Sequence, residues 1–435
     1  MSSPKSLRIG FLGFGTVGTG VYRMLVDNRA AIETKMGLPF EIVKIGVRDI
    51  AKERGVDPAL VTNDLDSIVD DPGINLVLEL IGGMDPAARL VERALQNGKS
   101  VVTANKELMA KDGYALVHLA RSKGLDLHYE AAVGGGIPLV QPLKHQLAGN
   151  DLVKLMGIVN GTTNYILTKM SRDGADFEEV LAEAQARGYA EADPTNDVDG
   201  FDAQYKLAIL ASIAFGRQVP VSGIYREGIR KITTEDIRYA EALGFRIKLL
   251  AICEPRDGGA RCLARVHPTM LPALHPLANV SDVYNAVWFQ GDFVGDVMFS
   301  GRGAGSHPTA SAVVGDVLDV GRNLSVAGPG SAIPWEAAIE TVPIDETESE
   351  FYLRIRVKDE PGVLGRVAGI LGGSRVSISA MQMKVVDPEA GLGEIVFLSH
   401  RCREADFRRA LAEIERLDVV ESVENWIRVE SALGL

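Results

Sequence analysis

The sequence predicts an α/β protein that begins with a parallel nucleotide-binding sheet and ends with a small ferredoxin-like domain. Over the first 130 residues, short apolar runs alternate with helical patterns, which is typical of a parallel sheet covered by helices. A glycine-rich turn follows the first of these runs. After residue 350 the pattern reads strand, helix, strand, strand, helix, strand, which is the ferredoxin-like order.

Length, charge and cysteine content exclude several classes of protein. The 435 residues favour two to four domains, and their net charge of −12 argues against nucleic acid or anionic lipid as a partner. Three cysteines are too few for a disulfide framework. No apolar run approaches the roughly 20 residues of a membrane span, and the N-terminus lacks a signal-peptide pattern. We therefore expect a cytoplasmic protein that binds neither nucleic acid nor membrane.

The nucleotide-binding domain is expected over residues 1–135. Its expected strands are Leu7–Leu12, Glu41–Val47, Ile74–Leu80, Ser100–Thr103 and Leu125–Glu130. Its expected helices are Val17–Met36, Ala87–Asn97 and Tyr114–Lys123.

An α+β domain is expected over residues 136–340, with its final helix packing back on the nucleotide domain. A helix over Phe177–Arg187 is indicated by the capping-box spacing of Asp176 and Glu179. The other expected elements are a helix over Gly200–Phe215 and strands at Val153–Val159, Leu263–Val266 and Phe293–Phe299.

The acidic segment Asp345–Glu350 is expected to be a linker to the third domain, residues 350–435. Apolar and polar residues alternate over Phe351–Lys358, which predicts a strand, and Pro361-Gly362 opens a helix. The remaining pattern predicts strands at Val376–Lys384, Glu394–Ser399 and Ser422–Val429, with a helix before the last.

The glycine-rich turn has the dinucleotide-binding pattern Gly13-Phe14-Gly15-Thr16-Val17-Gly18. It follows a strand and opens a helix, which is the context that the motif requires. Gly13 permits the tight turn, Gly15 lets backbone N–H groups approach a pyrophosphate, and Gly18 permits close packing. Arg48 and Asp49 follow the second strand. An acidic residue there suits the ribose of NAD and an arginine suits the 2′-phosphate of NADP, so both cofactors stay open, with Arg48 favouring NADP.

Asp202 and Lys206 lie four residues apart on the helix expected after an acidic loop that contains Glu191 and Asp197. Burial lowers the pKa of a lysine and a carboxylate raises it, so this pair is suited to proton transfer. An ordinary surface ion pair explains the spacing equally well. The acidic loop favours a substrate with a cationic group.

Two polar turns follow strands and are candidate ligand sites. Thr103-Ala104-Asn105-Lys106 ends a strand of the nucleotide-binding sheet, where ligands bind in such folds. The turn around Gly161 and Thr162 offers backbone N–H groups to a carboxylate, although a simple turn is an equal explanation.

Taken together, these motifs resemble the homoserine dehydrogenase family. The shared patterns are GFGTVG at Gly13–Gly18, VTANK at Val102–Lys106, NGTTNYIL at Asn160–Leu167, GYAEADPTNDVDGFDAQYKLAIL at Gly188–Leu210 and GAGSHPTASAV at Gly303–Val313. The match covers about residues 7–340. The run DEPGVLGRVAGIL at Asp359–Leu371 resembles an ACT domain, a type that commonly binds regulatory amino acids.

The resemblance implies NAD(P)-dependent interconversion of L-homoserine and L-aspartate 4-semialdehyde in threonine, methionine and isoleucine biosynthesis. Lys206 would donate or accept the proton, with Lys106 assisting near the nicotinamide. The implied substrate-binding residues are Glu191, Asp197, Asp202, Gly161 and Thr162. The implied cofactor contacts, beyond the glycine loop and Arg48, are Thr103, Lys106, Gly188, Gly303 and Gly305. The resemblance implies a monovalent cation, usually sodium, at Glu130, Val133, Gly135 and Ile137.

The resemblance also implies a homodimer or homotetramer, with dimerisation through the middle domain, and an amino-acid effector such as threonine near Gly362. Arg302 departs from the family, which more often has proline there. Two alternatives stay open: another NAD(P)-dependent dehydrogenase of a small aldehyde or hydroxy compound, and a non-catalytic sensor of nucleotide and amino acid. The pairing of Asp202 with Lys206 disfavours the sensor, which has no need of a proton donor.

Overall fold

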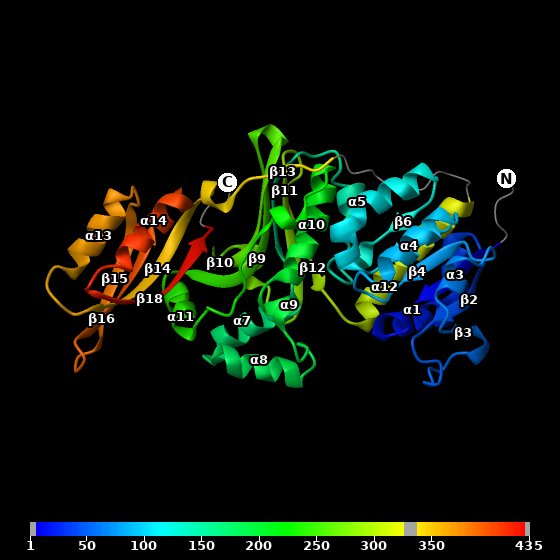
Figure 1. Ribbon diagram of the computed structural model, residues 1–435, viewed down its shortest axis with the longest axis horizontal. Coiled ribbons are helices and arrows are strands. Elements are labelled where there is room, and N and C mark those ends of the chain that lie inside the picture. The colour runs from blue at the N-terminus through cyan, green and yellow to red at the C-terminus, as the bar shows by residue number, and fades with distance from the viewer. Residues whose placement is uncertain (1–5, 326–336, 431–435) are drawn as a thin grey trace. The chain divides into compact units, whose positions relative to one another are not determined.

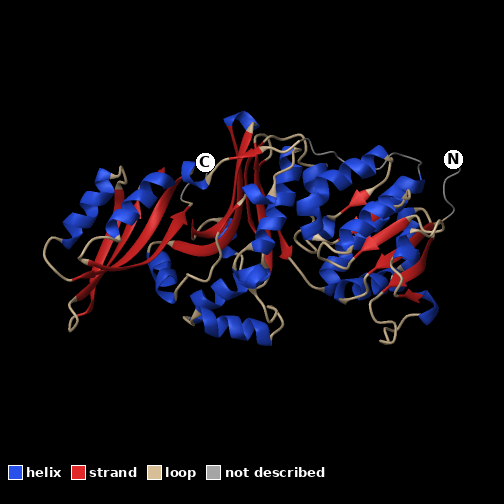
Figure 2. Cartoon of the chain, in the orientation of Figure 1, coloured by secondary structure: helices blue, strands red, loops and turns tan. Residues whose placement is uncertain are grey.

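The computed structural model describes residues 6–325 and 337–430, which pack into two compact units (Figures 1 and 2). Of the described residues, unit 1 comprises 6–155, 205–222, 284–325 and 337–339, and unit 2 comprises 156–204, 223–283 and 340–430. The division into three domains stays a prediction. None of the helices in the described ranges is long and apolar enough to cross a membrane.

Unit 1 is built on a six-stranded parallel sheet in the order β3-β2-β1-β4-β5-β6. The strand order reverses between β1 and β4, as in a dinucleotide-binding fold, which confirms the expected fold class. The strands are β1 (Leu7–Leu12), β2 (Phe40–Gly46), β3 (Val61–Thr62), β4 (Leu76–Glu79), β5 (Ser100–Thr103) and β6 (Leu127–His128). The helices are α1 (Thr16–Asp27), α2 (Arg29–Met36), α3 (Asp66–Val69), α4 (Ala87–Gln96), α5 (Lys106–Ser122) and α6 (Val140–Lys144).

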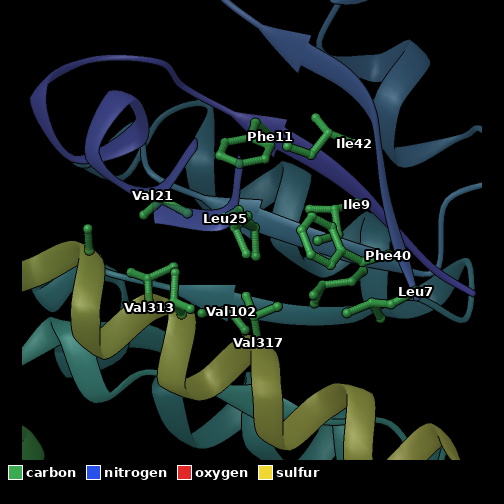
Figure 3. Packing of buried hydrophobic residues seen from close by; sticks show 14 of the residues in the cluster. Leu7, Ile9, Phe11, Val21, Leu25, Phe40, Ile42, Val102, Val313 and Val317 are labelled. Carbon is green, nitrogen blue, oxygen red and sulfur yellow. The ribbon is translucent and has the colours of Figure 1, made fainter. Parts of the chain in front are cut away.

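A helix from far along the chain completes this core. The hairpin β11 (Tyr284–Gly291) and β12 (Gly295–Arg302) leads into α12 (Ser306–Ser325), which packs against α1. Figure 3 shows Val313 and Val317 pointing from α12 into the apolar core beneath the sheet. Burial of these side chains contributes about 1.5–3 kcal/mol each, so α12 is an integral part of the nucleotide-binding unit.

Two expected helices of unit 1 have wrong bounds, and the strands expected at Leu125–Glu130 and Phe293–Phe299 are found at Leu127–His128 and Gly295–Arg302. The single helix expected over Val17–Met36 is two helices, because Asn28 leaves the helical conformation (φ −107°, ψ 18°). The helix expected from Tyr114 begins at Lys106, because the Asn105 side chain accepts the Leu108 N–H at 3.1 Å and caps an earlier first turn.

Unit 2 contains a mixed sheet in which β7, β9, β10, β18, β14, β16 and β15 lie side by side in that order. Its strands are the second half of β7 (Leu152–Ile158), which starts in unit 1, and β8 (Tyr225–Arg226), β9 (Phe245–Arg256), β10 (Arg261–Pro272), β13 (Glu340–Thr341), β14 (Glu348–Lys358), β15 (Ile378–Asp387), β16 (Leu392–Ser399), β17 (Cys402–Arg403) and β18 (Val420–Val429). Its helices are α7 (Gly161–Asp173), α8 (Phe177–Ala186), α9 (Thr195–Val198), α11 (Thr234–Ala242), α13 (Val363–Gly373) and α14 (Glu404–Ile414). The helix α10 (Phe201–Phe215) starts in unit 2 and continues in unit 1.

The C-terminal βαββαβ element has the expected ferredoxin-like order, with its four strands paired as β18-β14-β16-β15. It also continues the sheet that precedes it in the chain, because β18 pairs in parallel with β10 at Thr269–Arg428 and Met270–Val429. At this junction the buried Arg428 forms a bidentate ion pair with Glu404, at 2.6 and 2.7 Å. Arg428 also donates to Glu227, which follows β8, at 3.0 Å, so backbone pairing and an ion pair join the C-terminal element to the rest of unit 2.

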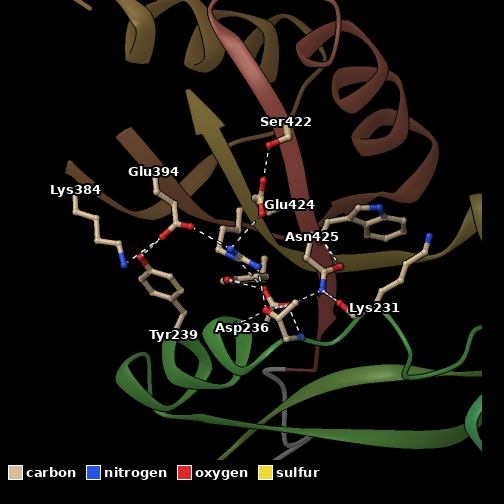
Figure 4. A network of polar contacts seen from close by, with 12 residues as sticks. Lys231, Asp236, Tyr239, Lys384, Glu394, Ser422, Glu424 and Asn425 are labelled. Carbon is tan, nitrogen blue, oxygen red and sulfur yellow. Dashed lines mark hydrogen bonds and ion pairs between the residues drawn. The ribbon is translucent and has the colours of Figure 1, made fainter. Parts of the chain in front are cut away.

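A second buried network holds the same element against α11 (Figure 4). Arg354 of β14 donates to Asp236 of α11 at 2.9 Å and to Glu394 of β16 at 3.0 Å. Asp236 also accepts from Asn425 of β18 at 2.7 Å and closes the capping box with Thr233. One carboxylate thus caps α11 and neutralises a buried arginine of the C-terminal element.

Two local expectations in unit 2 are wrong. The Asp176 side chain forms no capping bond at α8; instead it accepts from the Thr234 hydroxyl at 3.0 Å and links α8 to α11. The acidic segment Asp345–Glu350 is more than a linker, because it contains a 3-10 turn and β14 begins at Glu348. No disulfide links the three buried cysteines.

Candidate active site

The glycine-rich loop joins β1 to α1 in the conformation that a dinucleotide site needs. Gly13 has φ +101°, and a Cβ there would lie 2.7 Å from the Leu80 carbonyl oxygen. A Cβ on Gly18 would lie 2.7 Å from the Gly13 carbonyl oxygen, whereas one on Gly15 would meet nothing within 4 Å. The outer glycines therefore close the turn, and the loop surface at Gly15 is open where α1 presents its N–H groups.

Because Gly18 packs directly on the loop, we expect Gly18→Val to weaken NAD(P) binding at least tenfold. The added side chain must displace backbone rather than a flexible neighbour. Fluorescence titration with NADPH and NADH measures this effect. Gly315→Ala in α12 is the matched control, because an added Cβ there meets nothing within 4 Å. Equal affinity in Gly18→Val and Gly315→Ala would show that the close packing is dispensable.

The loops after β4 and β5 meet at the same edge of the sheet as the glycine loop. The buried carboxylate of Glu79 accepts the N–H groups of Ile81 and Gly82 at 2.9 and 3.0 Å and the Thr103 hydroxyl at 2.5 Å. Lys106 then begins α5 at this edge and is half-buried. Glu79 is absent from the residues expected from the sequence, although a carboxylate at the end of an apolar strand is the signal that marks it.

The two charged residues after β2 are the candidates for contact with the cofactor ribose. Arg48 and Asp49 are both exposed. The Asp49 carboxylate accepts the Ala51 N–H at 2.9 Å and is therefore turned onto its own loop.

The Arg302–Gly305 segment approaches both the glycine loop and the expected cation site. Ser306 donates its hydroxyl proton to the Thr16 carbonyl at 2.8 Å. A Cβ on Gly303 would lie 2.0 Å from the Asn285 amide nitrogen, so a larger residue there would require the buried Asn285 side chain to move. The Arg302 carbonyl accepts the Gly136 N–H at 3.3 Å, and its guanidinium lies 5.9 Å from the Tyr284 ring centre. The Arg302 backbone thus contacts the turn that contains Gly136, and its side chain lies beside Tyr284.

The residues expected to hold a cation form a buried, oxygen-rich turn. Glu130 accepts the N–H groups of Leu139, Val140 and Gln141 at 2.6–2.8 Å, and so also caps α6. Its own N–H donates to Asp316, whose pKa burial raises to about 7. Within the described residues, no hydrogen bond reaches the carbonyl oxygens of Val133, Gly135 and Ile137. Free buried carbonyls beside two buried carboxyl groups fit a hard monovalent cation.

No group of three or more His, Cys, Asp or Glu side chains in residues 6–325 and 337–430 is arranged to hold a metal ion. A cation at the Glu130 turn would therefore depend mainly on backbone oxygens.

In unit 2, Asn160 organises the expected substrate-binding residues. Its side-chain oxygen accepts the Thr163 N–H at 2.8 Å and caps α7, so Gly161 and Thr162 form the first turn of that helix. Its amide donates to Asp197 at 2.7 Å and to Asp202 at 2.9 Å. The N-terminus of a helix suits a carboxylate, and two carboxylates suit an ammonium group. The arrangement therefore fits the two charged ends of an amino acid.

The other residues expected to bind substrate or cofactor in this region, Gly188 and Glu191, are exposed after the end of α8. Glu191 is exposed in the loop after α8, where its carbonyl accepts from the Gln185 amide at 3.0 Å. Gly188 ends α8 with φ +74°. The Thr162 hydroxyl donates to the Tyr189 carbonyl at 2.7 Å and fastens this loop to α7.

Helix α10 carries Asp202 and Lys206 one turn apart, and both are buried, at 3% and 8% exposure. They are therefore not a solvated surface pair. A buried lysine one turn from a buried carboxylate is suited to hold or release a proton.

Comparisons with known proteins agree with this geometry. Residues 13–130 match the family model "Homoserine dehydrogenase, NAD binding domain", residues 138–318 match "Homoserine dehydrogenase", and residues 351–419 match "ACT domain". The homoserine dehydrogenase of Synechocystis sp. is 44% identical, covering 98% of this chain and 100% of that protein.

Solved structures agree as well. One of a homoserine dehydrogenase from Thiobacillus denitrificans superposes with a TM-score of 0.93 at 42% identity, covering 98% of this chain and 99% of that one. A hyperthermophilic archaeal homoserine dehydrogenase in complex with NADPH superposes with a TM-score of 0.62 at 26% identity, covering 74% of this chain and 99% of that one. The chain therefore belongs to the homoserine dehydrogenase family.

Proposed function

We propose that this enzyme interconverts L-homoserine and L-aspartate 4-semialdehyde, with the substrate held at the N-terminus of α7. The observation that carries the proposal is the Asn160 side chain, which joins the capped N-terminus of α7 to two carboxylates. The substrate carboxylate would bind the N–H groups of Gly161 and Thr162. The ammonium group of the substrate would bind Asp197, Asp202 and Glu191.

Lys206 is assigned the proton transfer and Lys106 a supporting role. The nicotinamide cofactor supplies or accepts the hydride when bound. In the reductive direction Lys206 donates a proton to the substrate oxygen, and in the oxidative direction it takes that proton back. Asp202 lies one helical turn before Lys206 on α10, and both side chains are buried. Lys106, at the start of α5, is assigned to the nicotinamide side of the site, with Thr103, Gly188, Gly303 and Gly305 as further cofactor contacts.

The substrate role of Glu191 predicts a separable kinetic defect. We expect Glu191→Gln to raise the KM for homoserine at least tenfold with a smaller change in kcat, because the exposed carboxylate is assigned to binding. Steady-state kinetics of homoserine oxidation measures both constants. Glu178→Gln, an exposed glutamate in the first turn of α8, is the control. An unchanged KM would remove Glu191 from ammonium binding.

NADP is the preferred cofactor in this proposal, because Arg48 is exposed while Asp49 is turned onto its own loop. The NADPH complex of the archaeal relative is in line with this. We expect Arg48→Glu to lower the ratio of kcat/KM for NADP over NAD at least tenfold. Lys52→Glu, an exposed charge in the same loop, should leave the ratio near that of the parent. A parent enzyme that prefers NAD would contradict the assignment.

We further assign a monovalent cation, with sodium as first choice, to the carbonyls of Val133, Gly135 and Ile137 beside Glu130. The ACT domain is assigned an amino-acid effector near Gly362, with threonine as first choice. A homodimer or homotetramer is supported by β15, an outer strand that exposes Met381, Met383 and Val385.

One set of measurements tests these assignments together. Homoserine oxidation is followed with NAD and NADP, with sodium replaced by a bulky organic cation, and with added threonine. Light scattering gives the oligomeric state. No turnover of homoserine with either nucleotide would overturn the central proposal, whereas insensitivity to sodium or threonine would remove only that assignment.

A further inference from the structure

A cavity of about 330 Å³ lies in unit 2 between α7, α11 and β9, and none of the residues assigned to catalysis lines it. The lining residues are Leu167, Thr168, Ser171, Arg172, Ile237, Glu241, Arg246, Ile247, Lys248, Ala278, Ser281 and Asp282. This volume is at the lower end of the range for small-molecule sites, so the cavity fits a small metabolite rather than a nucleotide.

Lys248 is a buried cation in the wall of this cavity. Its side chain is 5% exposed, and its ammonium group donates to the Asn164 side-chain oxygen at 3.0 Å and to the Val280 carbonyl at 2.6 Å. Both acceptors are neutral, and no carboxylate among the described residues forms an ion pair with it. Burial lowers the pKa of Lys248 to about 8. A buried ammonium group without a carboxylate is costly, and an anionic ligand would relieve that cost.

The other charged residues that line the cavity form ion pairs with one another. Arg246 pairs with Glu241 at 3.1 Å, and Arg172 lies 3.8 Å from Asp282 at the exposed rim. Among the described residues Lys248 thus has no carboxylate at ion-pair distance, and the more distant Asp282 offsets only part of the effect of burial on its pKa. Leu167, Ile237, Ile247 and Ala278 supply an apolar wall. The lining therefore fits one carboxylate attached to a short aliphatic chain.

We propose that this cavity binds a small aliphatic carboxylate of net charge −1, whose carboxylate pairs with Lys248. The ammonium group that would meet this ligand also holds Asn164, which lies one turn along α7 from the Asn160 cap. Occupation of the cavity would thereby act on the helix assigned to the substrate. That consequence rests on the proposed function, whereas binding at the cavity does not.

Binding is tested by ligand-observed NMR titration of the full chain with butyrate, and with 1-butanol as the neutral probe of equal length. We expect saturable binding of butyrate and none of butanol. Lys248→Met should weaken butyrate binding at least tenfold. Lys169→Met is the control, because Lys169 lies on α7, which lines the cavity, but does not line it itself and pairs with Asp173 and Glu183. Ser281→Trp should block the cavity from its exposed rim without altering Lys248.

The controls separate this site from the substrate site. Asp202→Asn should leave butyrate binding unchanged, and circular dichroism should show that Lys248→Met keeps the fold of the parent. Undiminished binding in both Lys248→Met and Ser281→Trp would overturn the proposal, as would loss of binding in Asp202→Asn. These titrations need no turnover, so a failure here differs from a failure of the homoserine assay.

Discussion

Replacing Lys206 by alanine is expected to lower kcat for homoserine oxidation by about 10²–10⁴-fold, the usual contribution of a positioned acid or base. The side chain is buried on α10, one turn after Asp202, so bulk water does not replace it readily as a proton acceptor. The affinity for NADPH should stay within about twofold of the parent, because the glycine loop belongs to other elements. Stopped-flow measurement of reduced cofactor and a binding titration give the two values.

Two controls separate chemistry from folding in this variant. Lys206→Met keeps most of the side-chain volume and should lose activity to a similar extent. Lys123→Ala, at the exposed end of α5, should behave as the parent. Small primary amines added to Lys206→Ala should restore part of kcat, which a purely structural lysine would not allow. Full activity in Lys206→Ala would exclude the assigned role.

Replacing Asp236 by alanine is expected to lower the free energy of unfolding by about 3–5 kcal/mol. Asp236 is fully buried, and Arg354 is 3% exposed, so the substitution leaves a buried guanidinium with only part of its counter-charge. The same substitution removes the capping box of α11 and the bond to Asn425. Guanidinium denaturation followed by circular dichroism measures the loss.

The size of this effect depends on burial. Arg366 and Asp418 form an ion pair of similar geometry at 2.5 Å, but both side chains are exposed. Asp418→Ala should therefore change stability little. Asp236→Asn should fall between the parent and Asp236→Ala, because it removes the charge but keeps a polar side chain of the same shape. Equal stability of Asp236→Ala and Asp418→Ala would refute the role of the buried network.

The nucleotide-binding half was predictable because its signals are local. Gly13–Gly18 could be assigned to a dinucleotide-binding loop from the spacing of the glycines, because each glycine meets a steric need of one tight turn. The alternation over Phe351–Lys358 marked a strand for the same reason, and Phe351, Leu353, Ile355 and Val357 all lie in the C-terminal core. The opposite face of that strand was not predictable, because Tyr352 and Arg354 are buried by partners distant in the chain.

The candidate site illustrates the same limit. The sequence could place Asp202 and Lys206 on one helical face. Their burial depends on the surrounding elements, and it disfavours the interpretation of the two residues as a surface ion pair. Asn160 could be read only as part of a turn, because its bonds to Asp197 and Asp202 join residues about 40 positions apart. Glu130 was expected only as a cation ligand, whereas it also caps α6.

By itself the sequence determined the α/β class, the dinucleotide loop, the ferredoxin-like C-terminal element and the family. The first three depend on residue types at short, regular spacing, where backbone geometry sets the pattern, and the family depends on the resemblance of five longer motifs. The tertiary structure decided the continuation of the sheet from β10 into β18 and the polar contacts around Asn160 and Asp236, whereas the packing of α12 on the nucleotide core was expected. These features arise from burial and charge pairing between distant segments, and such pairings leave no periodic pattern along the chain.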